Sequence, residues 1–141
     1  MDPLVDSARI VQGAMILPFI LMGLSHILQP DMWRSFFVHL HSLGEKGVLF
    51  RTFALELVPA IVLVTFHQVW HGLGVIITLY GIALTTKVCI SLLAPSIGLR
   101  SLAMADQKGS KAFVGAGVFL IALGILCAWL YFGIAISLFC L

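Results

Sequence analysis

The chain has 141 residues, of which 61% are hydrophobic and only 10% are charged. A soluble domain carries about 25% charged residues, so this composition excludes a soluble domain of the same size. The formal net charge of +2, without any run of Lys or Arg, also argues against nucleic acid as a partner. We therefore expect an all-α integral membrane protein that uses the lipid bilayer as its solvent.

Four stretches are apolar and long enough to cross a hydrocarbon core of about 30 Å. They lie at about residues 9–28, 48–66, 72–94 and 112–139. Each is expected to be a helix, because a chain in lipid must satisfy its backbone hydrogen bonds internally. The sequence predicts a four-helix bundle that forms one transmembrane domain over residues 1–141.

The segment 31–43 follows the first span and is too short to cross a membrane. Its apolar side chains recur at helical spacing, which predicts an amphipathic helix lying in the membrane interface. These residues are Trp33, Phe36, Phe37, Leu40 and Leu43. Such a helix is either a linker that follows the membrane surface or a surface for a partner, with Trp33, Phe36 and Phe37 making the contact.

Proline and cationic residues define the connections and the orientation. Pro30 and Pro95 end the first and third spans, because proline lacks the amide hydrogen that a continuing helix requires, and we expect loops at 29–47 and 95–111. Six Lys or Arg residues lie on the side of these loops, against Arg9 alone on the other. This bias predicts cytoplasmic loops and external termini, in a bacterial inner membrane. The six residues are Arg34, Lys46, Arg51, Arg100, Lys108 and Lys111.

Glu56 stands inside the second span, where a carboxylate is costly and normally faces the bundle interior with a partner. Lys87, in the third span, is expected at the same depth, because both residues lie roughly 10–12 Å from the same end of antiparallel helices. Arg51 is the competing partner. The pair is either a salt bridge that fixes packing or a polar site for protons, an anion or a quinone-like headgroup.

Histidines and cysteines offer weaker candidates. His26, near the end of the first span, is expected either to bond locally or to join Glu56 and Lys87 in a titratable cluster. His67 and His71 have the i, i+4 spacing that binds metal on a helix, but no third ligand is evident. We therefore predict no metal site and no resident cofactor, with a bound quinone or lipid as the open alternative.

Small residues recur at helical intervals in the later spans, including Gly117 and Gly124 in the fourth. Small side chains let transmembrane helices approach closely. They are expected either to pack inside one bundle or to form an interface with a membrane-protein partner or a second copy of the chain.

The first half of the chain resembles the DoxX/MauE-like group of small four-helix membrane proteins. The resemblance rests on Gly23 and His26, on Pro30 with the following aromatics, and on Glu56 between two leucines. It implies a four-helix bundle with Glu56 facing inward, but no single activity. Members of the group are associated with quinone-linked sulfur oxidation, amine dehydrogenase maturation and the chaperoning of membrane proteins. The three cysteines here form no CxxC pair, which does not fit a dithiol role.

Three functions agree with this pattern. The first is an accessory or assembly subunit of a larger membrane complex, which needs no enzymatic machinery. The second is a small binder or carrier of an amphipathic ligand such as a quinone or lipid, with Glu56, Lys87, His26 and Arg51 at the site. The third is a proton-coupled transporter that works as a dimer. No nucleotide loop or hydrolase motif is present, so the sequence favours a non-enzymatic role.

Overall fold

The computed structural model describes the backbone of residues 3–139 and the side chains of residues 6–104 and 107–133. Within these residues the chain is helical, with short connections and no strand. The elements in chain order are α1 (Pro3–Leu28), α2 (Pro30–Ser42), α3 (Glu45–Arg51), the π-helical turn η1 (Thr52–Glu56), α4 (Leu57–Phe66), α5 (Gly74–Leu93), α6 (Pro95–Lys108) and α7 (Ser110–Phe139).

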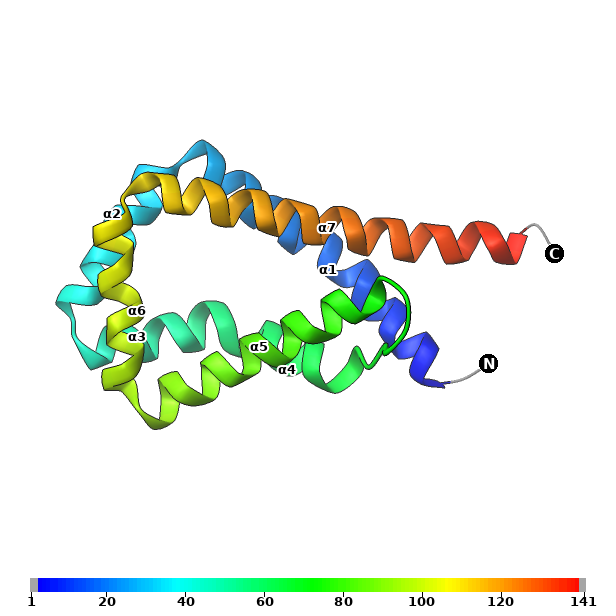
Figure 1. Cartoon of the computed structure of the whole chain (residues 1–141), viewed down its shortest axis with the longest axis horizontal. Helices are drawn as coiled ribbons and strands as arrows, with labels where there is room; N and C mark the ends of the chain where they lie inside the picture. The colour runs from blue at the N-terminus through cyan, green and yellow to red at the C-terminus, as the bar shows by residue number, and fades with distance from the viewer. Residues whose placement is uncertain (1–2, 140–141) are drawn as a thin grey trace.

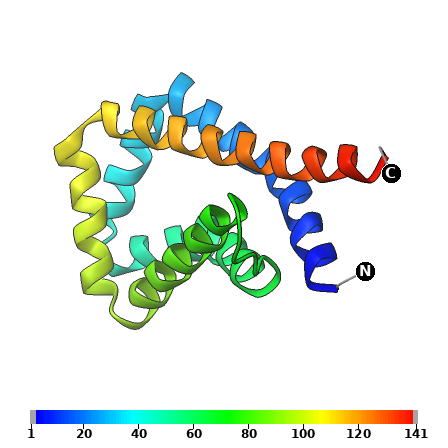
Figure 2. The same cartoon turned by 45° about the vertical axis from the view of Figure 1, so that its right-hand side comes forward.

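The helices form two pairs joined at one end of the molecule. α1 packs along α7, and α4 packs along α5, while α2, α3 and α6 gather where the pairs are connected (Figure 1). Both termini lie at the opposite end, and the turned view shows the same arrangement (Figure 2). The first and last helices of the chain are therefore neighbours, with the α4–α5 pair facing them.

Four of these helical segments are long and apolar enough to cross a membrane, which confirms the prediction of a four-helix membrane bundle. They are Asp6–Leu28, Glu45–Phe66, Gly74–Leu93 and Ser110–Gly133. Large apolar side chains such as Leu17, Phe53 and Leu93 are exposed on their outer faces. Lipid covers such faces in a membrane protein, whereas water would not tolerate them.

The prediction of a loop over residues 95–111 is wrong, because residues 95–108 form the helix α6. Pro95 occupies the first turn of α6, where the missing amide hydrogen has no intrahelical partner to lose. Leu102 is fully buried against Leu40 and Val48, and Leu99 packs beside it. The apolar contact therefore holds a helix whose composition is otherwise polar.

The amphipathic helix expected at residues 31–43 is present as α2, which begins with Pro30. Its apolar side packs inside the molecule. Phe36 and Phe37 pack beside buried Leu40 in the cluster shared with α6, and the Phe37 ring lies 5.3 Å from that of Phe113 in α7. α2 and α6 together close one end of the bundle.

Glycines set the close approach of α1 and α7. A Cβ atom on Gly117 would lie 2.6 Å from the carbonyl oxygen of Gly23, and one on Gly124 would lie 2.7 Å from Ile20 Cγ1. Both distances are shorter than real Cβ contacts, so the two backbones meet where side chains are absent. Gly117 and Gly124 thus pack against α1 of the same chain.

Candidate functional site

The π-helical turn η1 brings two charged residues of the second span together. Arg51 and Glu56 are five positions apart, and five α-helical residues turn through about 500°, which would leave the side chains about 140° apart. Instead, the Leu57 amide donates to the Thr52 carbonyl oxygen in the wider i→i+5 pattern. Arg51 Nε then lies 3.4 Å from Glu56 Oε1. Single π turns inside α-helices occur frequently at functional sites.

Lys87 of α5 completes an ionic cluster around Glu56. Its Nζ atom donates to Glu56 Oε1 at 2.6 Å, so the same oxygen meets an ammonium and a guanidinium. Arg51 also donates through Nη1 to Ser101 Oγ at 2.8 Å and through Nη2 to Ser91 Oγ at 3.4 Å. Arg51 therefore ties the second span to both α5 and α6.

Burial divides this cluster into a sheltered part and an accessible part. Arg51 is 1% exposed and Glu56 is 9% exposed, whereas the Lys87 side chain is 47% exposed. Glu56 Oε2 and Arg51 Nε are buried without a hydrogen-bond partner. A buried polar atom left unbonded costs about 1–3 kcal/mol, and native proteins rarely leave such atoms without a reason. The Glu56 carboxylate therefore has one oxygen that can still accept a hydrogen bond.

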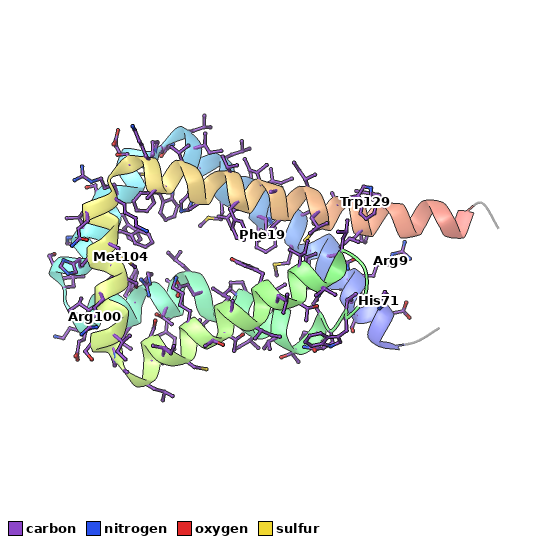
Figure 3. All side chains as sticks on the ribbon, viewed as in Figure 1. Arg9, Phe19, His71, Arg100, Met104 and Trp129 are labelled. Atoms are coloured by element: carbon purple, nitrogen blue, oxygen red, sulfur yellow. The ribbon has the colours of Figure 1, made fainter. Side chains whose placement is uncertain are left out.

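Tyr80 shows which way the accessible part faces. Its ring centroid lies 5.8 Å from that of Phe19 in α1 and 5.8 Å from that of Phe119 in α7. Lys87 follows Tyr80 by seven positions, a rotation that leaves the two side chains about 20° apart. Lys87 is thus on the side of α5 that faces the α1–α7 pair, where Figure 3 labels Phe19.

His26 is held in an aromatic cluster at the same end of the bundle. Its ring stacks on Trp33 with centroids 4.2 Å apart, and its Nδ1–H donates to the Met22 carbonyl oxygen at 2.7 Å. Trp33 Nε1 in turn donates to Ser25 Oγ at 3.0 Å. No hydrogen bond or ion pair between described residues joins His26 to Glu56 or Lys87. Because His26 follows Phe19 by seven positions, it lies on the side of α1 that faces α5.

A second buried polar group, built around His67, joins α1 to the α4–α5 pair at the other end. Gln12 Nε2 lies 3.0 Å from His67 Nε2, and His67 Nδ1 lies 3.0 Å from Thr78 Oγ1. Because an amide nitrogen can only donate, His67 Nε2 accepts and Nδ1 carries the proton toward Thr78. Sequence reasoning missed this group, although Gln12 inside an apolar span was a signal that could have found it.

The helical pairing considered for His67 and His71 does not occur. α4 ends at Phe66 and α5 begins at Gly74, so the two histidines lie in the turn between these helices. His67 is fully buried with both ring nitrogens bonded, while His71 is exposed (Figure 3). No group of three or more His, Cys, Asp or Glu side chains able to hold a metal occurs among the described residues.

Of the three cysteines, two lie in the described part of the chain and both are free thiols. Cys89 is exposed and Cys127 is buried, and Cys140 lies outside the described residues. The candidate site around Glu56 consists of charged and hydroxyl groups and includes neither described thiol.

We expect His67 to make the stability of the bundle depend on pH. Burial lowers its pKa below the ordinary value of 6.5, so the folded state holds the proton less tightly than the unfolded state. The contribution is therefore complete above pH 6.5 and is lost as the pH falls from there through the lower folded pKa. The slope between these two pKa values approaches about 1.4 kcal/mol per pH unit, the value for one proton.

Thermal unfolding of the purified protein in detergent, measured from pH 8 to pH 5, checks this expectation. His67→Gln should flatten the dependence below pH 6.5, and His71→Gln, which changes an exposed histidine in the same turn, should leave it as in the wild type. An unchanged slope in His67→Gln would show that another group takes up the proton.

Comparison of the chain with protein-family models, with curated proteins and with solved structures gives no match, so the proposals below rest on the geometry of the site and on the sequence.

Proposed function

We propose that this protein binds the polar head of an amphipathic ligand, such as a quinone or a lipid, at Glu56 and Lys87. One observation carries the proposal: Glu56 Oε2 is buried inside a membrane span with no hydrogen-bond partner. A carboxylate at that depth is expensive and is commonly retained for function. A hydroxyl of a lipid head, or of the quinol form of a quinone, would remove this cost by donating to Oε2.

The neighbouring groups suit a head that carries both donor and acceptor oxygens. Lys87 offers ammonium hydrogens on its half-exposed side chain, and Glu56 offers the free oxygen. With both cations charged, Arg51, Glu56 and Lys87 together carry one net positive charge, which favours an anionic or electron-rich head. Tyr80 supplies an aromatic surface on the same side of α5 as Lys87, whereas His26 is buried against Trp33 at the same end of the bundle. The apolar tail would lie among the spans.

The accessory-subunit role stays a second possibility. The exposed apolar faces suit lipid and protein partners equally, and Gly117 and Gly124 find their contacts inside the chain. A proton-coupled transporter is a third possibility, since the Glu56 carboxylate is titratable. The DoxX/MauE-like resemblance, which we retain as a proposal, implies an inward-facing Glu56 and agrees with the binding role.

For orientation, we propose a bacterial inner membrane with α2, α3 and α6 at the cytoplasmic face and both termini outside. Arg100 lies at the α6 end, whereas Arg9 lies at the end of the termini (Figure 3). The positive charge gathered around α2, α3 and α6 supports this orientation, because cytoplasmic segments of membrane proteins are enriched in Lys and Arg.

Mass spectrometry of organic extracts from the gently solubilised protein tests the binding role. We expect a quinone or lipid to be retained in stoichiometric amount by the wild type. Glu56→Gln and Lys87→Met should each reduce its retention about tenfold, because each removes a hydrogen bond to a charged group.

Two charge-matched variants at exposed positions serve as controls. Glu45→Gln and Lys46→Met change the same residue types at the start of α3 and should retain the ligand at the wild-type level. Equal retention by all four variants would overturn the proposed site. A wild-type protein that retains no such molecule and instead co-purifies with a membrane protein at fixed stoichiometry would favour the accessory-subunit role.

A further inference from the structure

A separate cleft of about 540 Å³ lies between α1 and α7, at the end of the molecule that holds both termini. It is lined by Asp6, Arg9, Ile10, Gly13, Ala14 and Tyr131. Asp6 and Arg9 stand near the N-terminal end of α1, before its long apolar stretch, and Tyr131 of α7 lies beside Arg9. The cleft is therefore at the level where lipid headgroups meet the protein.

The cleft holds one anionic and one cationic side chain that do not neutralise each other. Asp6 and Arg9 are three positions apart on α1, yet among the described residues they form no ion pair with each other. The Arg9 guanidinium instead lies over the Tyr131 ring, 5.5 Å from its centroid. A guanidinium that contacts an aromatic ring through a cation–π interaction can still donate its N–H groups to an anion.

Gly13 makes this arrangement possible. A Cβ atom at this position would lie 2.9 Å from Tyr131 Cε2, so a larger residue would push the ring away from α1. Along the same helix, exposed apolar side chains continue toward the middle of the membrane. Ile10 is 71% exposed, Leu17 is 64% exposed and Leu21 is 55% exposed. The charged end of the cleft at Asp6 and Arg9 is thus followed along α1 by a strip of exposed apolar side chains.

We propose that this cleft binds a glycerophospholipid with a zwitterionic ethanolamine headgroup. The phosphate would accept hydrogen bonds from Arg9, and the primary ammonium would donate to Asp6. The acyl chains would follow the strip below Ile10. A choline headgroup has no N–H to donate to the carboxylate, and a glycerol headgroup has hydroxyls but no positive charge to pair with Asp6. Charge complementarity therefore selects the ethanolamine lipid over both.

Lipid retention after reconstitution tests this site independently of Glu56 and Lys87, which do not line the cleft. The full chain is reconstituted into vesicles of equimolar phosphatidylethanolamine, phosphatidylcholine and phosphatidylglycerol with identical acyl chains, then re-extracted in mild detergent. The lipids still bound are quantified by native mass spectrometry. We expect phosphatidylethanolamine to be retained about fivefold over each of the others, the ratio that one additional charge-assisted contact provides at an exposed site.

Replacing each charged residue should change the retained lipids in a different way. Asp6→Asn should abolish the preference for ethanolamine over choline and raise retention of phosphatidylglycerol. Arg9→Gln should reduce retention of all three lipids, and Arg9→Lys should restore it in part. Lys111→Gln, an exposed charge at the other end of α7, should leave the lipid profile as in the wild type. Equal retention of the three lipids by the wild type, or a profile that Asp6→Asn leaves unchanged, would overturn the proposal.

Discussion

Glu56→Gln is expected to lower the free energy of unfolding by about 3–5 kcal/mol, the cost of stranding one partner of a buried ion pair. The stranded group is Arg51, which is 1% exposed and contacts the Glu56 carboxylate at 3.4 Å. Lys87→Met should cost much less, because the lost ammonium is half-exposed and Glu56 keeps Arg51 as a partner. Unfolding in mixed detergent–SDS micelles, followed by tryptophan fluorescence, measures these differences.

The double variants identify the partner that matters. Combining Glu56→Gln with Arg51→Met should recover most of the lost stability, since it removes the isolated buried charge, whereas combining Glu56→Gln with Lys87→Met should recover little. Glu45→Gln, at an exposed position in α3, provides the baseline for a change from Glu to Gln. If Glu56→Gln is no more destabilising than Glu45→Gln, the carboxylate does not hold the bundle together.

The second large effect concerns the contact between α1 and α7. Gly117→Ala should destabilise the protein by about 1–3 kcal/mol, the usual cost of an overpacked interior. The added Cβ would meet the Gly23 carbonyl oxygen at 2.6 Å, and this atom is backbone that cannot rotate away. The two helices would have to separate along their length.

Gly115→Ala offers a matched control one half-turn away on the same helix. A Cβ atom at Gly115 meets nothing within 4 Å, so we expect no loss and a small gain from the higher helix propensity of alanine. Both variants are measured by the same unfolding assay. Similar values for Gly115→Ala and Gly117→Ala would show that α1 and α7 are not closely packed at this point.

Much of the fold follows from the sequence, because hydropathy and length decide which segments cross a membrane. The four spans are present at nearly the expected residues, and α2 lies where its helical pattern indicates. α6 could not be predicted in this way. Its composition is polar around Gln107 and Lys108, and the burial of Leu102 against α2 and α3 holds it in place. That contact is tertiary and has no local signature.

The candidate site was predictable in part for the same reason. Residue depth along antiparallel helices placed Glu56 beside Lys87, and the structure joins them at 2.6 Å. Depth does not determine the direction in which a side chain points, however. The π turn that directs Arg51 toward the same carboxylate has no recognisable sequence pattern in Thr52–Glu56. His26 has the expected depth but bonds locally, because stacking with Trp33 fixes its ring. The His67 group was missed because Gln12 lies 55 positions away from His67 in the sequence, and His67 itself is in a turn.

The pairing of α1 with α7 bears on how the chain assembles in the membrane. α1 leaves the ribosome before α7, so the surface that covers Gly23 does not exist until α7 has been synthesised. The α4–α5 hairpin, whose helices are neighbours in the sequence, has no such delay. We therefore expect the glycine surface of α1 to stay uncovered in the bilayer until α7 is inserted. Chains that end before α7 should be the ones that membrane proteases degrade.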